Sequence, residues 1–268
     1  MSATSDTRPD SWRKPPFIAN PLLRYALYLG ALVYIVFTLA TLPIDWDRVS
    51  DGLSRAQRIF SGAFPPSFDR AGLLFDGFME SLKIAIIATM GGIILSVPLA
   101  FMAAGNIAPK PIYLLGRAIV IIARSFHPVI VAIIFVKAVG FGPFAGALTL
   151  VVYSVGFVAK LLAERIEEID FGQVEAMRSA GAGFLTTQVY AVLPQVMPRL
   201  VGLGIYQLDS NLRASAVVGI VGAGGIGATL ANAFGRYDYD FALAITMVIV
   251  GVILVSEAVS GVIRKRIT

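Results

Sequence analysis

The chain has 268 residues, of which 57% are hydrophobic and 15% are charged, and its mean hydropathy is +0.78. Soluble domains carry about 25% charged residues, so this composition excludes an ordinary soluble domain and predicts an integral membrane protein. The formal charge of +5 does not indicate nucleic-acid binding, because the basic residues lie mainly beside the apolar runs, where they orient a membrane protein. The absence of cysteine excludes disulfides and thiolate metal sites.

The N-terminal part of the chain predicts a tail followed by a membrane anchor. Residues 1–21 are polar and mixed in charge, which predicts a cytoplasmic tail. The apolar run 22–42 is longer than the hydrophobic region of a secretory signal, and it ends without a small-residue cleavage site. We therefore expect residues 22–42 to stay in the protein as an N-terminal transmembrane anchor.

Residues 43–75 predict an extracytoplasmic loop that contains an interfacial helix. Apolar residues after Trp46 recur at helical spacing opposite charged residues, namely Val49, Leu53, Ala56, Ile59, Phe60 and Phe64. An amphipathic helix of this kind is typical of a membrane–water interface. Two interpretations stay open: the helix docks an extracytoplasmic partner, or it rests on the lipid headgroups.

Five further apolar runs are each about as long as the roughly 20 residues that a transmembrane helix needs. They cover residues 81–104, 113–136, 144–162, 200–221 and 241–263. Pro98 and Pro128 lie inside two of them, which predicts kinks whose freed carbonyls neighbouring helices or water must satisfy. We expect an all-α membrane protein of about six transmembrane helices, with residues 76–266 forming one bundle domain.

The distribution of Lys and Arg predicts the orientation of the chain. With the N-terminus inside, the inner set has thirteen members: Arg8, Arg13, Lys14, Arg24, Lys110, Arg117, Lys160, Arg165, Arg178, Arg199, Arg264, Lys265 and Arg266. The outer set has five: Arg48, Arg55, Arg58, Arg70 and Arg236. Because basic residues are enriched on the cytoplasmic side, we expect both termini in the cytoplasm of a bacterial cell, with the protein in its inner membrane.

Residues 163–198 are too polar to enter a bilayer, although they separate two apolar spans. Acidic residues precede a short helical stretch, which we expect to end at Gly181 and Gly183, because glycine there permits positive φ and a turn into a second short helix. Pro194 and Pro198 mark the return to the membrane. The predicted product is a helical elbow below the bilayer that inserts into a groove on a soluble partner.

The elbow resembles the cytoplasmic signature of permease subunits in binding-protein-dependent ABC importers, which runs Glu-Ala-Ala, three residues, Gly, nine residues, Ile, one residue, Leu-Pro. Five residues match in register: Glu175, Ala176, Gly181, Leu193 and Pro194. Met177 replaces the third small residue and Ala191 replaces the isoleucine, and both keep apolar character. The resemblance implies that residues 175–177, 181, 193 and 194 couple the bundle to an ATPase.

A wider resemblance over residues 74–266 is closest to the phosphonate-type permeases of this family. It is carried by RSFHPVIVAIIF from Arg124, by GFGPFAGAL from Gly140 with AERIEEID from Ala163, and by DSNLRASAVVGIVGAGGIG from Asp209. The first stretch departs from the family, which usually has proline and glutamate in the places of His127 and Pro128.

The wider resemblance implies a type I importer of phosphonate or a related phosphorus oxyanion, such as phosphite or a phosphate ester. It also implies the partners: a pair of ATPases that bind ATP and Mg²⁺, a second permease chain that is identical or a paralogue, an extracytoplasmic binding protein and membrane lipid. The chain itself is expected to hold no cofactor and no metal.

Arg213 stands in an apolar span, where an unpaired guanidinium costs several kcal/mol, so we expect it to point inward. Asp209 and Arg213 share one helical face, and Asn211 and Ser215 share a neighbouring one. The guanidinium fork matches phosphonate oxygens, which predicts that Asn211, Arg213 and Ser215 line the substrate path. The alternative is a buried Asp209–Arg213 pair that holds two helices together.

Arg124 and His127 lie one turn apart beside Pro128, and they are the other candidates for the substrate path. His127 is the only histidine of the chain, and a lone imidazole lacks the further ligands that a zinc site needs. We favour a hydrogen bond from His127 to the kinked backbone over a contact with the passing anion.

Glycines cluster at the end of the fifth apolar span, at positions 219, 222, 224, 225 and 227. Gly222, Gly224 and Gly227 satisfy the spacing of a dinucleotide-binding motif, but such a motif follows a strand in a βαβ unit, whereas this run ends a transmembrane span. Gly219, Gly222, Gly224, Gly225 and Gly227 are therefore expected to permit close helix packing or to line a gate.

The sequence has no phosphate-binding loop, hydrolytic triad or metal cluster, so we expect no enzyme activity in this chain. The alternative function is a secondary anion transporter that works without ATP, in which Asp209, Arg213 and His127 couple anion and proton movement. Inverted repeats would support this alternative, and none is evident.

Overall fold

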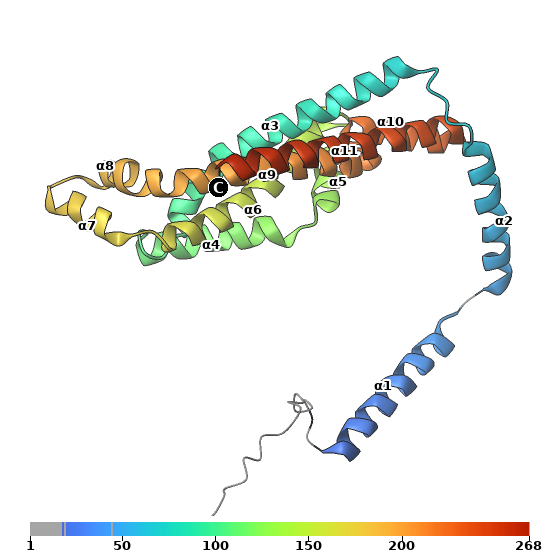
Figure 1. The fold of residues 1–268 in the computed structure, drawn as a ribbon, viewed down its shortest axis with the longest axis horizontal. Helices are drawn as coiled ribbons and strands as arrows, with labels where there is room; N and C mark the ends of the chain where they lie inside the picture. Colours follow the sequence, from blue (N-terminus) through green and yellow to red (C-terminus); the bar gives the residue numbers. More distant parts are fainter. Residues whose placement is uncertain (1–17, 19, 44, 268) are drawn as a thin grey trace, which may run out of the picture. The chain divides into compact units, whose positions relative to one another are not determined.

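The computed structural model describes residues 18, 20–43 and 45–267, and these ranges contain helices and no strand. The helices are α1 (Pro21–Thr41), α2 (Trp46–Ala63), α3 (Ala71–Ala103), α4 (Lys110–Ser125), α5 (Pro128–Val139), α6 (Pro143–Glu167), α7 (Phe171–Ser179), α8 (Phe184–Thr187), η1 (Gln188–Val192), α9 (Leu193–Val218), η2 (Gly219–Ala223), α10 (Ile226–Gly235) and α11 (Tyr239–Ile267). The elements η1 and η2 are short π-helices. The predicted all-α fold class is confirmed (Figure 1).

The chain divides into two units, Met1–Gln57 and Arg58–Thr268. In the first unit, the side chain of Asn20 accepts a hydrogen bond from the N–H of Leu22 and so caps α1. Helix α1 has no buried side chain and is long and apolar enough to cross a membrane. Of the predicted tail, residues 1–17 and 19 lie outside the described residues.

The helix predicted after Trp46 is present as α2, and it extends across the boundary between the two units. The apolar side chains of its predicted face, among them Val49, Leu53 and Phe60, are exposed. An exposed apolar face opposite charged residues fits the membrane interface.

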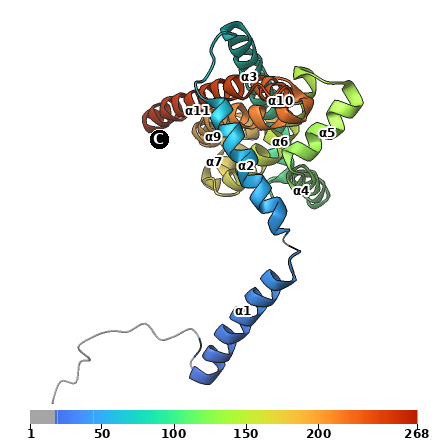
Figure 2. The same ribbon diagram turned by 90° about the vertical axis from the view of Figure 1, so that its right-hand side faces the viewer.

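In the second unit, α3, α6 and α9 form the centre of the bundle, and α6 packs most extensively against α3. Small residues let these two helices approach closely: a Cβ on Gly92 of α3 would lie only 2.3 Å from the Cβ of Ser154 on α6. Figure 1 shows α7 and α8 at one end of the bundle and α10 at the other, and the end-on view in Figure 2 places α11 and α5 on opposite sides.

The described residues include five helices long and apolar enough to cross a membrane, or six spans if α4 and α5 are counted as one broken span. Two helices differ from the predicted apolar runs in detail. Helix α3 begins at Ala71, ten residues before the predicted start of that span at Ser81. The span predicted over 113–136 is not one kinked helix, because α4 and α5 meet at an angle of 90°.

The break between α4 and α5 follows from the backbone of Phe126 and His127. Both residues are extended, with ψ of 132° and 140°. For His127 the cause is Pro128, because the residue before a proline is disfavoured in the helical region. Pro128 then starts α5 at a position where its missing N–H costs no helical hydrogen bond. Proline therefore begins a new helix here instead of kinking an existing one.

Candidate functional site

The predicted elbow is present between α6 and α9, and its turn is fixed by glycine. Gly181 has φ of +78°, which glycine adopts at little steric cost. The N–H of Gly181 donates to the carbonyl of Arg178, and the N–H of Ala182 donates to that of Met177. These two bonds form a Schellman motif, which ends α7. The predicted break at Gly183 is also present, because this residue precedes α8 in an extended conformation, but its φ of −69° is not the positive φ that glycine permits.

The elbow packs onto the bundle through one face and leaves the other face open. Val174 is fully buried and Met177 is half-buried in the apolar cluster that contains the ends of α6 and α9. Glu175 and Ala176 are exposed on α7. Large apolar side chains on the following segment are also exposed, with Leu185 at 76% and Tyr190 at 69%. The predicted coupling residues at the far end differ in burial, since Leu193 is half-buried and Pro194 is exposed.

Gln195 of α9 connects the elbow to the bundle by hydrogen bonds, and no sequence motif indicated this role. Its Oε1 accepts from the N–H of Asp170 at 2.9 Å, and its Nε2 donates to the carbonyls of Asp170 at 3.2 Å and of Ala191 at 2.7 Å. The side chain of Asp170 caps α7 by accepting from the N–H of Gly172. A single glutamine therefore joins the start of α7 to the start of α9. Asp170 and Gln195 are 25 positions apart, so no local sequence pattern could have revealed this contact.

The Gln195→Ala variant should loosen the elbow without unfolding the bundle. It removes three hydrogen bonds, each worth about 1 kcal/mol, so we expect amide hydrogen exchange in α7 to become about tenfold faster or more. Gln173→Ala is the matched control, because Gln173 is an exposed amide on α7. Equal exchange rates in the two variants would contradict the role of Gln195.

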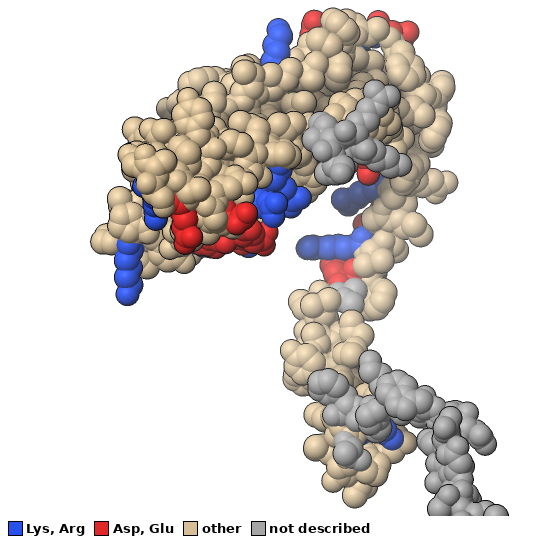
Figure 3. Space-filling model, turned by 60° about the vertical axis from the view of Figure 1, so that its left-hand side comes forward, with Lys and Arg blue, Asp and Glu red and all other residues tan. Residues whose placement is uncertain are grey.

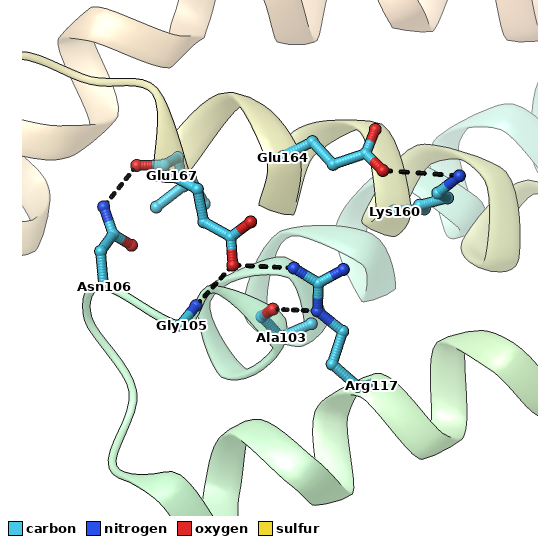
Figure 4. Close-up of polar contacts among 8 residues, drawn as sticks. Ala103, Gly105, Asn106, Arg117, Lys160, Glu164 and Glu167 are labelled. Carbon is cyan, nitrogen blue, oxygen red and sulfur yellow. Dashed lines mark hydrogen bonds and ion pairs between the residues drawn. The ribbon is translucent and has the colours of Figure 1, made fainter.

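A second group of polar contacts joins the base of the elbow to α4 (Figure 4). Glu167 lies at the end of α6. Its Oε1 accepts two hydrogen bonds, from Nη2 of Arg117 and from the N–H of Gly105, both at 2.7 Å. Nε of Arg117 donates to the carbonyl of Ala103. Asn106 donates to the carbonyl of Ile166. These bonds fix the loop between α3 and α4 against the end of α6.

Charged side chains of both signs also pair along the outer face of α6 near this end. Lys160 pairs with Glu164 at 3.4 Å, and Arg165 pairs with Glu168 at 3.4 Å. In the space-filling view of Figure 3, a group of acidic side chains with basic neighbours lies on the lower part of the bundle, while much of the remaining visible bundle surface is uncharged. This separation suits a bundle whose middle lies in lipid and whose elbow end lies in water.

Asn211 does not line a path in this structure, because its side chain is fully buried between α3, α6 and α9. Its Nδ2 donates to the hydroxyls of Thr89 and Ser154, both at 2.9 Å. Gln207 donates to Ser154 at 3.0 Å and to Oδ1 of Asn211 at 3.1 Å. The network joins the three helices through buried hydrogen bonds, although Oε1 of Gln207 has no hydrogen-bond partner among the described residues.

The Asn211→Ala variant should therefore lower thermal stability. It removes the buried hydrogen bonds of Asn211 to Thr89, Ser154 and Gln207, each worth about 1 kcal/mol, which predicts a melting temperature lower by about 5–10 °C. The measurement is thermal unfolding of the purified protein in detergent. Asn232→Ala, which removes an exposed amide from α10, should leave the melting temperature unchanged. An unchanged melting temperature in Asn211→Ala would contradict this role.

Arg213 pairs with Asp209 one turn earlier on α9, and Asp209 is 7% exposed. The other oxygen of Asp209 accepts from the hydroxyl of Ser256 on α11 at 2.6 Å. The pair is thus part of the contact between α9 and α11, as one of the two predicted alternatives requires. The Arg213 side chain is still 48% exposed, so the guanidinium also reaches open space. Ser215 is buried and donates to the carbonyl of Leu212 on its own helix.

Arg213 and His127 line the same cavity, which has a volume of about 330 Å³ and lies between α5, α6 and α9. Nδ1 of His127 accepts a hydrogen bond from the N–H of Val129 at 3.3 Å, so His127 caps α5. Arg124 is not part of this cavity. It lies before the 90° break and lines a separate cavity with Arg117 and Lys160. Arg124 and His127, predicted as a polar pair one turn apart, therefore lie at different cavities in this structure.

The predicted glycine run forms a tight reversal between α9 and α10. Gly222, Gly224 and Gly225 have φ of +95°, +79° and +75°. A Cβ on Gly219 would lie 2.4 Å from the carbonyl oxygen of Gly224, and one on Gly227 would lie 1.9 Å from that of Ala216. Near the C-terminal end of the run, the Ser81 hydroxyl of α3 accepts from the N–H of Ile226 at 2.9 Å. Gly219 and Gly227 therefore permit close approach of the backbone, and the three glycines with positive φ permit the reversal.

The described residues contain no group of three or more His, Cys, Asp or Glu side chains that could hold a metal ion. Fold and site together define a class: a multi-pass helical membrane protein with an elbow at one end of its bundle and an open cavity, lined by Arg213 and His127, between α5, α6 and α9. Residues 96–268 match the family described as binding-protein-dependent transport system inner membrane component. Because this match covers more than half of the chain, the chain belongs to that family.

Individual relatives agree with the family. The phosphate-import permease protein PhnE of Mycolicibacterium smegmatis is 44% identical over 78% of this chain, which spans only 40% of that protein. The phosphite transport system permease protein PtxC of Stutzerimonas stutzeri is 38% identical over 83% of this chain and 82% of its own length. An inward-facing structure of the methionine ABC transporter MetNI matches with a TM-score of 0.65 at 25% identity, over 75% of this chain and 99% of the matched one.

The family predicted from the elbow signature is thereby confirmed. The chain is a multi-pass permease component of the inner membrane in an ABC importer, and it is not itself an enzyme. Membership of a binding-protein-dependent system implies two kinds of partner, an ATPase and a substrate-binding protein.

Proposed function

We propose that this permease imports a small phosphorus oxyanion, a phosphonate or a related ion such as phosphite or a phosphate ester. Two relatives that cover most of this chain carry names of phosphate and phosphite import. The cavity that contains Arg213 and His127 supports the same class of cargo, because a guanidinium binds tetrahedral oxyanions through two parallel hydrogen bonds.

The observation that carries the mechanism is the elbow, which is hydrogen-bonded to the bundle through Gln195 yet exposes Glu175 and Ala176. We infer that this surface binds the ATPase. A pair of ATPase subunits then binds ATP and Mg²⁺, and this chain binds neither. Closure of that pair moves two elbows, one from each of two permease chains, and Gln195 and Glu167 transmit the movement to α9 and α6.

This coupling requires both termini and the elbow on the cytoplasmic side, as the distribution of Lys and Arg predicts. The extracytoplasmic binding protein then delivers the anion at the opposite end of the bundle. The second permease chain is a further copy of this chain or a paralogue. Substrate selection rests mainly with the binding protein, because a path that must release its cargo cannot hold it tightly.

The test is uptake into proteoliposomes that contain the permease and its ATPase, with binding protein outside and ATP inside. Methylphosphonate, phosphite and glycerol phosphate form the panel, and methionine is the negative control. We expect ATP-dependent uptake of at least one phosphorus oxyanion and none of methionine. Uptake that is equal with and without ATP would support the alternative, a secondary anion transporter, and would contradict the proposal.

A further inference from the structure

The cavity between α5, α6 and α9 contains polar residues that the sequence analysis did not select. Besides His127 and Arg213, it is lined by Tyr153 of α6 and Ser210 of α9. No Asp or Glu lines it. The cavity therefore presents a guanidinium, an imidazole and two hydroxyls, and it presents no carboxylate that would repel an anion.

The hydrogen-bonding state of these side chains leaves donors available to a ligand. Neither hydroxyl, of Tyr153 or of Ser210, has a hydrogen-bond partner within the part of the chain that the structure describes. Nδ1 of His127 already accepts from the backbone of α5. A neutral imidazole with this bond carries its proton on Nε2, which makes that nitrogen a donor. The side chain of Arg213 uses Nη2 for Asp209 and has further N–H groups.

The positive charge of Arg213 in the cavity is balanced by Asp209. Asp209 is buried, and its two oxygens are occupied by Arg213 and by Ser256 of α11. The pair Asp209–Arg213 therefore carries no net charge, although the guanidinium still presents N–H groups to the cavity. A site of this kind attracts an oxyanion less strongly than an unpaired arginine does, which suits a path that must also release it.

The rest of the lining is apolar and comes from α5 and α9, including Val129, Ala214 and Val217. A phosphonate has an oxyanion head and an organic substituent joined by a carbon–phosphorus bond. The lining therefore offers both hydrogen-bond donors for the oxyanion head and apolar side chains for the substituent. An inorganic anion such as phosphite would use the donors alone.

We propose that this cavity is a transient binding site for a monosubstituted tetrahedral phosphorus oxyanion, in which Tyr153 and Ser210 donate hydrogen bonds beside Arg213 and His127. The proposal rests on the proposed function for the class of cargo. It goes further by assigning the site to α5, α6 and α9, by adding Tyr153 and Ser210, and by excluding Arg124, Asn211 and Ser215. The apolar residues hold the organic substituent.

The test measures binding directly, separately from transport. The purified complex of permease and ATPase, without binding protein or nucleotide, is titrated with methylphosphonate, and binding is followed by saturation-transfer NMR on the methyl protons. A hydrogen bond to a charged group contributes about a factor of 10 in affinity. We therefore expect Tyr153→Phe and Ser210→Ala each to raise the dissociation constant about tenfold. Phosphite should compete with methylphosphonate but bind more weakly.

Tyr206→Phe is the matched control. It removes the same hydroxyl from a tyrosine of α9 that stacks on Phe157 with ring centroids 5.4 Å apart and that does not line the cavity. This variant should bind methylphosphonate as the unchanged complex does. The proposal is overturned if Tyr153→Phe and Ser210→Ala bind like Tyr206→Phe, or if phosphite binds as tightly as methylphosphonate.

A lipid headgroup shares the phosphate chemistry, so the same titration is repeated in nanodiscs of phosphatidylcholine with and without phosphatidylglycerol. We expect the dissociation constant of methylphosphonate to be the same in both. If the dissociation constant of methylphosphonate rises threefold or more with the anionic lipid, the cavity binds lipid headgroups and the proposal is overturned. The proposed function is tested independently, since it fails only if the unchanged complex shows no ATP-driven uptake of phosphorus oxyanions.

Discussion

The Glu175→Lys variant is expected to lose ATP-driven uptake and to release the ATPase during purification. Glu175 is an exposed carboxylate on α7 with no ion-pair partner among the described residues, and the buried Val174 and half-buried Met177 hold α7 in place without it. Removing one member of a desolvated charge pair at an interface costs about 2–5 kcal/mol, which weakens ATPase binding by about 30-fold or more.

The measurement is the amount of ATPase that co-purifies with the permease, together with the rate of uptake. Glu168→Lys is the control, because Glu168 is an exposed acidic residue that lies outside α7, at the C-cap of α6, and pairs with Arg165 of α6. It should retain the ATPase. Normal ATPase recovery and uptake in Glu175→Lys would show that this face of α7 does not bind the ATPase.

The Gly227→Ala variant is expected to be the most destabilising single methyl addition in the α9–α10 reversal. The added Cβ would lie 1.9 Å from the backbone oxygen of Ala216, and a helix backbone cannot move aside as a flexible side chain can. Overpacking of this kind costs about 3 kcal/mol, which corresponds to a loss of about 10 °C in melting temperature.

Thermal unfolding in detergent measures this loss. Gly235→Ala, at the end of the same helix, has nothing within 4 Å of the added Cβ and should melt at the same temperature as the unchanged protein. Equal melting temperatures of Gly227→Ala and Gly235→Ala would mean that α10 does not pack against α9 in this way.

The number of spans and the elbow were predictable because each depends on local properties of the chain. Run length and hydropathy identify a transmembrane helix, and the positive φ required at Gly181 is a property of one residue. The 90° break before Pro128 had a local signal too, in the extended residue that proline imposes. Its angle, however, is set by how α4 and α5 pack against α6.

The partners of polar side chains were not predictable in the same way. Thr89 and Asn211 are 122 positions apart, and Asp209 and Ser256 are 47 apart. Sequence periodicity placed Asn211 beside the face of Arg213, but it could not say that one side chain turns into the bundle and the other reaches a cavity. Tyr153 and Ser210 gave no signal at all, because a single hydroxyl in an apolar run is common in membrane helices.

The cytoplasmic position of the elbow, and its contact with an ATPase, can be tested by one labelling experiment. Because the chain has no cysteine, Ala176→Cys places a single thiol on the exposed face of α7. A membrane-impermeant maleimide should label it in inverted vesicles stripped of the ATPase, and not in right-side-out vesicles, and adding back the ATPase should protect it. Labelling from the outside, or labelling that the bound ATPase leaves unchanged, would contradict coupling through this elbow.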